Sequence, residues 1–214
     1  MKTVNGILSV LIKTIIIIVI LQSISCNKFT SCKNISNGDI IFHESLSFQS
    51  ESLKLITNSK YTHMGIIIII KGKYYVCEAV QPVKLTLLTE WIEKGKEGHF
   101  VVKRLKNSKK ILTEDSLLKM KKTGKSFLGR PYDLQFFWDD KKIYCSELVW
   151  KIYQRGAGVQ LCSLKTFKDF NFSDKKFQKE VKRRYGNNIP RDEKVVSPEQ
   201  IYNSKLLKLV CQKN

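Results

Sequence analysis

Five consecutive isoleucines, Ile66–Ile70, constrain the fold of this chain more than any other feature of its sequence. β-branched residues favour extended backbone, and five residues are far too few to span a bilayer. The isoleucines belong to a longer, largely β-branched stretch that begins near Thr62 and ends at the lysine-glycine-lysine stretch 71–73. A second apolar stretch follows at 74–80. A glycine between two such stretches is typical of a turn. The sequence therefore predicts a β-hairpin whose isoleucine strand is buried on both faces.

Turn residues, helix caps and apolar spacing predict the other elements. Further strands are expected at 38–42 and 100–105, and helices within 45–59, at 88–92, at 113–122, from 145 and from 197. Thr113 and Ser197 are candidate N-caps. Gly124 is expected to end the helix that Thr113 begins, and Gly156 and Gly158 are expected to end the helix that begins at 145. This mixture of a hairpin, further strands and separate helices predicts an α+β fold.

The chain is strongly basic, with a formal net charge of +19 over 214 residues. An anionic cell wall or membrane surface would suit such a protein as a partner. The plainer interpretation is a solvated, lysine-rich surface. Most of the basic residues are lysines and no nucleic-acid-binding motif is present, so nucleic acid is not expected as a partner.

The N-terminus resembles a secretory signal. An unbroken apolar run at 14–21 follows Lys13, and small residues precede Cys26. We predict that residues 1–25 are a signal peptide and that 26–214 form one domain, exported as a secreted or membrane-anchored protein. Cys26 directly follows Ser25, as in lipoprotein processing sites, so lipidation of Cys26 is expected. An ordinary cleaved signal and an uncleaved signal anchor are the alternatives.

The chain contains six cysteines, at positions 26, 32, 77, 145, 162 and 211. In an oxidising compartment they predict at most one or two disulfides. No pair has the CxxC spacing of a zinc site, and neither a metal nor a cofactor is expected.

Cys145 is the best candidate for a nucleophile because it is the first residue of a predicted helix. Backbone N–H groups at a helix N-terminus stabilise a thiolate and can bind a developing oxyanion. The alternative is a buried cysteine that only packs beneath the helix. Cys77 is a rival thiol, but it lies in the middle of a strand.

A cysteine nucleophile needs a base and a group that orients the base. Among three histidines, His63 leads because it stands at the head of a rigid strand, whereas His43 follows a short strand and His99 lies in a polar turn. Glu78 is the candidate orienting group. A simple hairpin register leaves it about four residues short of a position opposite His63, so a bulge or twist must close that gap. We expect all three groups at the edge of a cleft rather than in the core.

Five short motifs follow one another along the chain: Gly38-Asp39-Ile40-Ile41-Phe42, Thr62-His63-Met64-Gly65-Ile66, Val76-Cys77-Glu78-Ala79, Gly129-Arg130-Pro131-Tyr132-Asp133 and Tyr144-Cys145-Ser146-Glu147-Leu148-Val149. In this order they resemble the permuted papain-like cysteine hydrolases, the YiiX/YebB-type branch of the NlpC superfamily of cell-wall peptidases. Trp91 and Ser197-Pro198 fit the same branch. The resemblance covers nearly all of the predicted mature chain, but the stretch from Lys165 to Tyr185 matches no motif.

The resemblance implies a circularly permuted papain-like fold, with a mixed, largely antiparallel sheet packed on the helix that carries the catalytic cysteine. It assigns Cys145 as nucleophile, His63 as base and Glu78 as the orienting third member. It also places Tyr132 beside the oxyanion site, and for Tyr132 a merely packed aromatic is the alternative. Glu147 is interpreted as support for the first helical turn rather than as part of the chemistry.

The implied activity is hydrolysis of an amide or peptide bond, such as one in a cell-wall peptide, through an acyl-enzyme. Two alternatives stay open. One is a lipid acyl hydrolase or acyltransferase that uses the same site, which a basic surface and a lipid anchor would suit. The other is a ligand-binding module without catalysis, against which the joint presence of Cys145, His63 and Glu78 argues.

Overall fold

The computed structural model describes residues 32–213 apart from 33, 48, 49, 52, 53, 55, 56, 58 and 171–173, and without the side chains of 176 and 177. The chain forms two compact units, Met1–Lys33 and Asn34–Asn214, and the fold described below is that of the second. The predicted signal peptide, Cys26 and much of the helix expected within 45–59 lie outside the described residues. No helix in the part that is described is long and apolar enough to cross a membrane.

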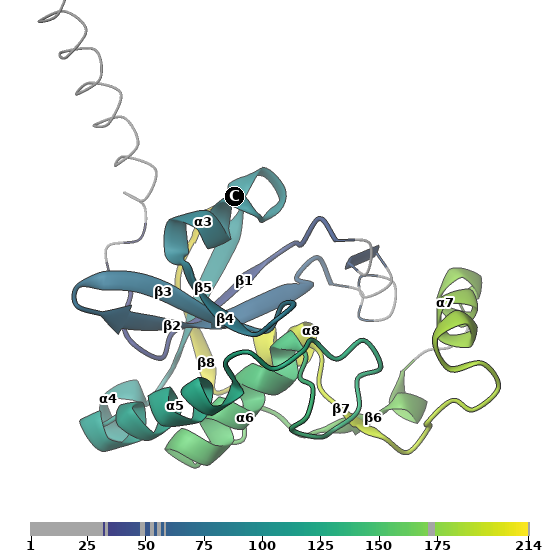
Figure 1. Cartoon of the computed structure of the whole chain (residues 1–214). Helices are drawn as coiled ribbons and strands as arrows, with labels where there is room; N and C mark the ends of the chain where they lie inside the picture. Colours follow the sequence, from purple (N-terminus) through teal and green to yellow (C-terminus); the bar gives the residue numbers. More distant parts are fainter. Residues whose placement is uncertain are drawn as a thin grey trace, which may run out of the picture. The chain divides into compact units, whose positions relative to one another are not determined.

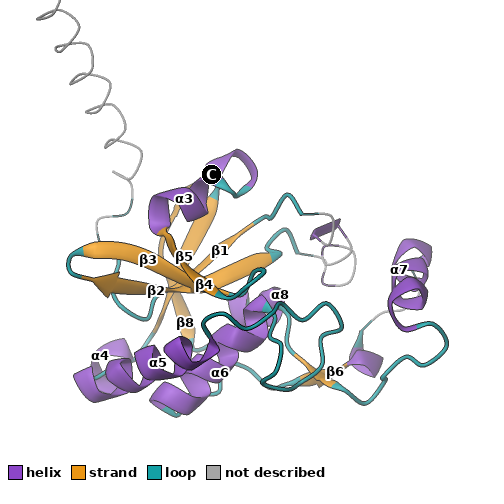
Figure 2. Cartoon of the chain, in the orientation of Figure 1, coloured by secondary structure: helices purple, strands orange, loops and turns teal. Residues whose placement is uncertain are grey.

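A six-stranded sheet forms the centre of this unit, with the strand order β4-β3-β2-β1-β5-β8. Every neighbouring pair of strands is antiparallel (Figure 2). The strands are β1 (Ile40–His43), β2 (His63–Ile70), β3 (Lys73–Glu78), β4 (Lys84–Leu87), β5 (Phe100–Leu105) and β8 (Leu207–Lys213). The expected α+β class and the largely antiparallel sheet are confirmed.

The predicted hairpin is β2 and β3, joined by a turn at Lys71 and Gly72. The burial expected for its isoleucines is only partly right. Ile66 and Ile67 are buried, but residues 68–70 are half-buried. They lie at the end of the hairpin next to the exposed turn, where less of the molecule is available to cover them.

Two long helices pack together on one face of the sheet, and the short helix α3 (Leu88–Glu93) lies on the other (Figure 1). α5 (Glu114–Phe127) begins at Thr113, whose hydroxyl accepts a hydrogen bond from the Ser116 N–H at 3.3 Å. α5 does not end at Gly124, as expected, but continues past it. A Cβ there would make ordinary contacts with Ile152 and Cys77, so the packing of α5 on its neighbours does not require a glycine at this position.

α6 (Cys145–Ala157) is the central helix of the unit. Its side chains at Leu148, Val149 and Ile152 are almost completely buried, as the helical spacing predicts. It ends at Gly158, which has a left-handed backbone with φ of 68°. Gly156 was expected to share in ending the helix, but it instead provides close contact between helices, because a Cβ there would lie 2.4 Å from Met120.

The remaining described elements are short: α4 (Ser108–Ile111), the paired strands β6 (Lys165–Thr166) and β7 (Lys194–Val195), α7 (Lys175–Tyr185), α8 (Pro198–Tyr202), and 3-10 turns at Lys96–Gly98 and Phe167–Asp169. α8 begins at Ser197 as predicted, with the Ser197 hydroxyl accepting from the Gln200 N–H at 3.1 Å. Cys32 and Cys211 are each disulfide-bonded, whereas Cys77, Cys145 and Cys162 are free thiols.

Candidate active site

Cys145 is the first residue of α6, so its side chain lies where the N–H groups of the first helical turn have no partner within the helix. The segment before α6 fixes this position. The Val196 N–H donates to the Tyr144 hydroxyl at 3.2 Å, and the Ser146 hydroxyl donates to the Val196 carbonyl at 2.7 Å. These bonds hold both neighbours of Cys145 against Val196, which lies between the strand at 194–195 and α8.

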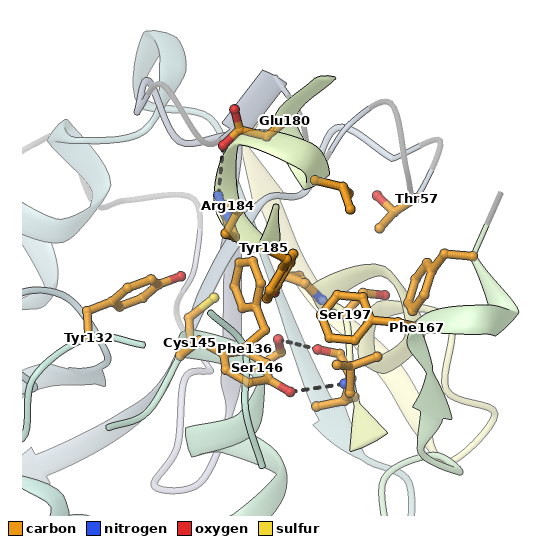
Figure 3. A pocket seen from close by; sticks show the side chains of 16 residues that line it. Thr57, Tyr132, Phe136, Cys145, Ser146, Phe167, Glu180, Arg184, Tyr185 and Ser197 are labelled. Atoms are coloured by element: carbon orange, nitrogen blue, oxygen red, sulfur yellow. Dashed lines mark hydrogen bonds and ion pairs between the residues drawn. The ribbon is translucent and has the colours of Figure 1, made fainter. Parts of the chain in front are cut away.

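Tyr132 reaches Cys145 because the segment around it runs beside the segment that leads into α6. The Ile143 N–H donates to the Pro131 carbonyl at 3.1 Å, and Tyr132 forms a parallel bridge with Ile143. Burial, and then the charge of Cys145, raises the pKa of the Tyr132 phenol well above its usual value. The hydroxyl of Tyr132 points toward the Cys145 sulfur (Figure 3). The neutral hydroxyl is therefore a donor beside the sulfur.

His63 is the first residue of β2 and lies at the end of the sheet, where α6 begins. Its Nε2 is 2.6 Å from Oε2 of Glu78, the last residue of β3. Its ring is also close enough to the Cys145 side chain for Cys145 to raise the pKa of His63. Since Nε2 is engaged by Glu78, Nδ1 is the nitrogen left for the sulfur. The structure thus brings together the three residues proposed from the sequence.

The expected gap of about four residues between His63 and Glu78 is wrong. The hairpin register pairs Ile66 with Cys77 and is regular along the ladder, which sets Glu78 opposite Gly65, two residues from His63. Such diagonal neighbours on one face are within reach of long side chains, so no bulge is needed. Gly65 makes this possible: a Cβ on it would lie 2.7 Å from the Cys77 carbonyl and 3.4 Å from the Glu78 Cβ.

Glu78 accepts two further hydrogen bonds. The Trp91 indole N–H of α3 donates to Oε2 at 2.8 Å, and the Thr86 hydroxyl of β4 donates to Oε1 at 2.5 Å. Because β3 and β4 pair Glu78 with Lys84, Thr86 is its diagonal neighbour on the same face. Three donors from three elements fix the carboxylate. Thr86 was not identified from the sequence, because its role depends on the pairing of β3 with β4.

The protonation states match the geometry. Burial favours the neutral imidazole, but the interactions of the ring with Cys145 and Glu78 outweigh it and raise the pKa of His63 to about 9. Burial also favours a protonated Glu78, but the hydrogen bond and charge of His63 outweigh it and lower the pKa of Glu78 to about 2. At neutral pH the pair is therefore an imidazolium and a carboxylate.

The competing residues are placed differently. Burial raises the pKa of Cys77 to about 12, which removes it as a rival nucleophile. His99 pairs with a different carboxylate: its Nε2 lies 3.7 Å from the Glu97 carboxylate, in a turn. His43 lies next to the site: it pairs with His63 across β1 and β2, and the ring centroids are 5.2 Å apart. Burial, together with the charge of His63, lowers the pKa of His43 to about 3, so it is neutral and cannot share the proton.

All three groups line depressions, as expected of a cleft edge, but the expectation that they lie outside the core is wrong for two of them. Cys145 is 2% exposed and Glu78 is 1% exposed, so both are buried. Glu147, by contrast, has the supporting position expected for it. Its carboxylate is 2.6 Å from the Lys151 ammonium one turn along α6 and accepts from the Tyr144 N–H at 3.4 Å.

An apolar pocket opens beside Cys145, and Tyr132, Phe136 and Tyr185 are among the side chains that line it (Figure 3). It encloses about 770 Å³, counting the part open to solvent. α7 contributes one wall through Glu180, Val181, Arg184 and Tyr185. Phe167 and Phe170 line the pocket as well, so described residues of the stretch 165–185, which no sequence motif explained, contribute to the site. The richness of this stretch in lysine and phenylalanine was the available signal, since it suits a wall with one polar and one apolar face.

A thiol at a helix N-terminus, aligned with an imidazole and a buried carboxylate on an antiparallel sheet, defines the class of papain-like thiol hydrolases. Comparison with known proteins gives the family. Residues 34–211 match the family described as "Permuted papain-like amidase enzyme, YaeF/YiiX, C92 family", and the chain belongs to it. It is a papain-like cysteine amidase, and the suspected resemblance is confirmed.

Two relatives illustrate the similarity. The uncharacterized protein YiiX of Escherichia coli strain K12 is 42% identical over 175 residues, which cover 82% of this chain and 85% of that protein. The crystal structure titled metalloprotein yiiX from Escherichia coli O157:H7 superposes with a TM-score of 0.79 at 41% identity, covering 83% of this chain and 97% of that one. In the described part of the present chain, no group of three His, Cys, Asp or Glu side chains is placed to hold a metal ion.

Proposed function

We propose that this protein is an exported cysteine amidase in which Cys145 is the nucleophile, His63 the general acid and base, and Glu78 the group that orients His63. The observation that carries the proposal is the position of the His63 ring, which interacts with the Cys145 side chain and lies with its Nε2 2.6 Å from Oε2 of Glu78. The imidazolium and the carboxylate have the charges that their roles require.

The proposed reaction is acyl transfer. The Cys145 thiolate attacks the amide carbonyl, and the oxyanion accepts hydrogen bonds from the Cys145 backbone N–H and the Tyr132 hydroxyl. The His63 imidazolium gives its proton to the departing nitrogen. The neutral imidazole then takes a proton from water, which hydrolyses the thioester and restores the thiolate and the imidazolium. Glu78 keeps the ring in place and stabilises its charged form throughout.

The acyl half of the substrate would occupy the pocket that Cys145 lines. Because its walls are mostly apolar, this pocket suits an apolar acyl group, either a hydrophobic peptide side chain or a lipid chain. The same observation favours the second candidate function, hydrolysis or transfer of a lipid acyl group. Export, and lipidation of Cys26, rest on the signal-like residues 1–25.

Product analysis tests the proposal. The protein is incubated with peptidoglycan fragments, with N-acyl amides and with phospholipids, and the products are identified by mass spectrometry. Cys145→Ala is the control. We expect new amine and carboxylic acid products from at least one amide, all of them absent with Cys145→Ala. Products from phospholipids alone would favour the lipid alternative, and products that persist in Cys145→Ala would exclude the proposed nucleophile.

A further inference from the structure

We infer that the second depression at this site, on the His63 side, is the leaving-group subsite and takes an amine that carries a carboxylate. The inference rests on the proposed function. It adds the chemistry of the departing half of the substrate, which the acyl pocket does not define.

The two depressions divide the reaction centre between them. The apolar pocket is lined by Cys145 but not by His63, whereas the other depression is lined by His63 and Glu78 but not by Cys145. Tyr132 lines both, so they meet at the reacting atoms. The second depression encloses about 1230 Å³, counting space open to solvent, which is enough for an amino acid or a short peptide.

The chemistry of the reaction indicates which half of the substrate each depression holds. As the sulfur–carbon bond forms and the carbon–nitrogen bond breaks, the proton on His63 must pass to the departing nitrogen. The amine therefore lies on the His63 side, and the acyl carbon stays with Cys145. Water then cleaves the thioester, releasing the carboxylic acid from the Cys145 side and regenerating the thiolate and the protonated ring.

The charges of this depression are positive. Lys94 and Lys142 line it, and the carboxylate among its lining residues is Glu78, which is already committed to His63, Thr86 and Trp91. Burial and His63 have the larger effects on the pKa values of Glu78 and His43, and the positive charge of Lys94 adds a smaller lowering effect on both.

Nearby lysines differ from these two. Lys96 is 3.4 Å from the Glu44 carboxylate, and Lys151 is 2.8 Å from Asp140. Among the described residues, by contrast, no carboxylate forms an ion pair with the ammonium of Lys94 or Lys142. The two ammonium groups remain available for an anionic group of the substrate.

Neutral donors add to this preference. The side-chain oxygen of Gln81 accepts from the Tyr132 N–H at 2.7 Å, so the NH2 end of the Gln81 amide is the part left to donate. Ser47 contributes a hydroxyl to the same lining. Donors and ammonium groups together match the acceptor oxygens of a carboxylate, and they match a cationic amine poorly.

An acyl-transfer assay tests the inference without knowledge of the natural substrate. p-Nitrophenyl decanoate acylates the thiol and releases p-nitrophenol, and the acyl-enzyme then divides between water and an added amine. By microscopic reversibility, the attacking amine occupies the leaving-group subsite. Equal concentrations of glutamic acid dimethyl ester, glutamine and glutamate are supplied as acceptors, and decanoyl amides and decanoic acid are measured by mass spectrometry.

We expect the ratio of transfer to hydrolysis to be highest for glutamate and lowest for the dimethyl ester. Lys94→Ala and Lys142→Ala should each lower the preference for glutamate roughly two- to fivefold, as is usual for exposed charge pairs, and added salt should lower it as well. Lys110→Ala, an exposed lysine of α4 outside both depressions, is the matched control and should keep the preference.

Different results would contradict the leaving-group subsite and the proposed function. Release of p-nitrophenol with equal transfer to all three acceptors, or a preference that Lys94→Ala and Lys142→Ala leave unchanged, would overturn the subsite alone. If Cys145→Ala releases p-nitrophenol as fast as the native protein does, the proposed function is wrong, and the subsite inferred from it is overturned too.

Discussion

At the scale of single residues, Glu78 has two roles that substitution can separate. It orients His63, and it is a buried acceptor for Trp91 and Thr86. Glutamine retains an oxygen that can accept from both His63 and Trp91, and its amide can donate to the Thr86 hydroxyl. Alanine removes every one of these bonds and leaves a buried indole N–H without a partner.

We therefore predict that Glu78→Gln keeps measurable activity, whereas Glu78→Ala loses much more activity and about 1–3 kcal/mol of unfolding free energy. Initial rates and thermal melts of both variants check this, with Cys145→Ala as the inactive reference. If Glu78→Ala is fully active and its melting temperature is unchanged, the orienting group must be another residue near His63.

The pH dependence of stability follows from the two shifted groups. Because the pKa of His63 is raised from 6.5 to about 9, its contribution is complete below pH 6.5 and is lost as the pH rises through 9. Because the pKa of Glu78 is lowered from 4.5 to about 2, its contribution is present above pH 4.5 and is lost as the pH falls through 2. Melting temperatures should be highest between these ranges, and His63→Asn should show a smaller alkaline decline. An alkaline decline of the same size in His63→Asn would show that another group causes it.

The candidate site illustrates what a sequence can and cannot predict. Cys145, His63 and Glu78 were identified from a helix start, a strand start and a short motif, all of which are local features. Thr86 and His43 were not assigned roles, because their positions depend on which strands are neighbours in the sheet. The register between β2 and β3 was misjudged because the exact position of a turn is not evident from composition.

At the scale of elements, the β2–β3 hairpin positions the base and its orienting group. Most strands and helices were predicted, since their apolar spacing and caps are strong local signals. The predicted helix ends that the structure does not show are at glycines. Gly124 and Gly156 resemble helix ends in the sequence, but they lie inside α5 and α6, where tertiary packing outweighs the low helix propensity of glycine.

Gly65 and Gly124 provide a matched pair of substitutions. At Gly65 an added Cβ would lie 2.4 Å from Val76 Cγ1 and 2.7 Å from the Cys77 carbonyl, so β2 and β3 must separate. We predict that Gly65→Ala lowers the unfolding free energy by about 1–3 kcal/mol and reduces activity, because Glu78 moves away from His63. At Gly124 the nearest atoms are 3.4 Å away, and Gly124→Ala should be neutral or stabilising.

Denaturant unfolding and initial rates of both variants test this account. The activity of Gly65→Ala should fall by more than its loss of folded protein explains, since the damage is at the site. Full specific activity in the folded fraction of Gly65→Ala would show that the close approach of the strands does not position Glu78.

At the scale of the whole molecule, the compact unit Asn34–Asn214 follows an N-terminal stretch that resembles an export signal. The net charge of +19 would favour association with an anionic wall or membrane once the protein is exported. The unit contains the entire candidate site, so anchoring of the N-terminal stretch would hold the site near a surface without changing its residues.

We predict that the mature protein lacks residues 1–25 and begins at Cys26. Intact-mass measurement of membrane and soluble fractions tests this, and a diacyl or triacyl mass on Cys26 would establish the lipoprotein. A Cys26→Ser variant should then move from the membrane to the soluble fraction. A mature protein that still begins at Met1 would contradict cleavage and leave the uncleaved signal anchor.

The central claim, that Cys145 is a nucleophile activated by His63, is tested most directly by competitive alkylation. Native protein is treated with limiting iodoacetamide near neutral pH, and peptide mapping gives the extent of labelling at Cys77, Cys145 and Cys162. We predict that Cys145 is labelled first and that His63→Ala slows its labelling strongly, while labelling of the other two thiols stays low. Equal labelling of Cys77 and Cys145 that is unchanged in His63→Ala would contradict the claim.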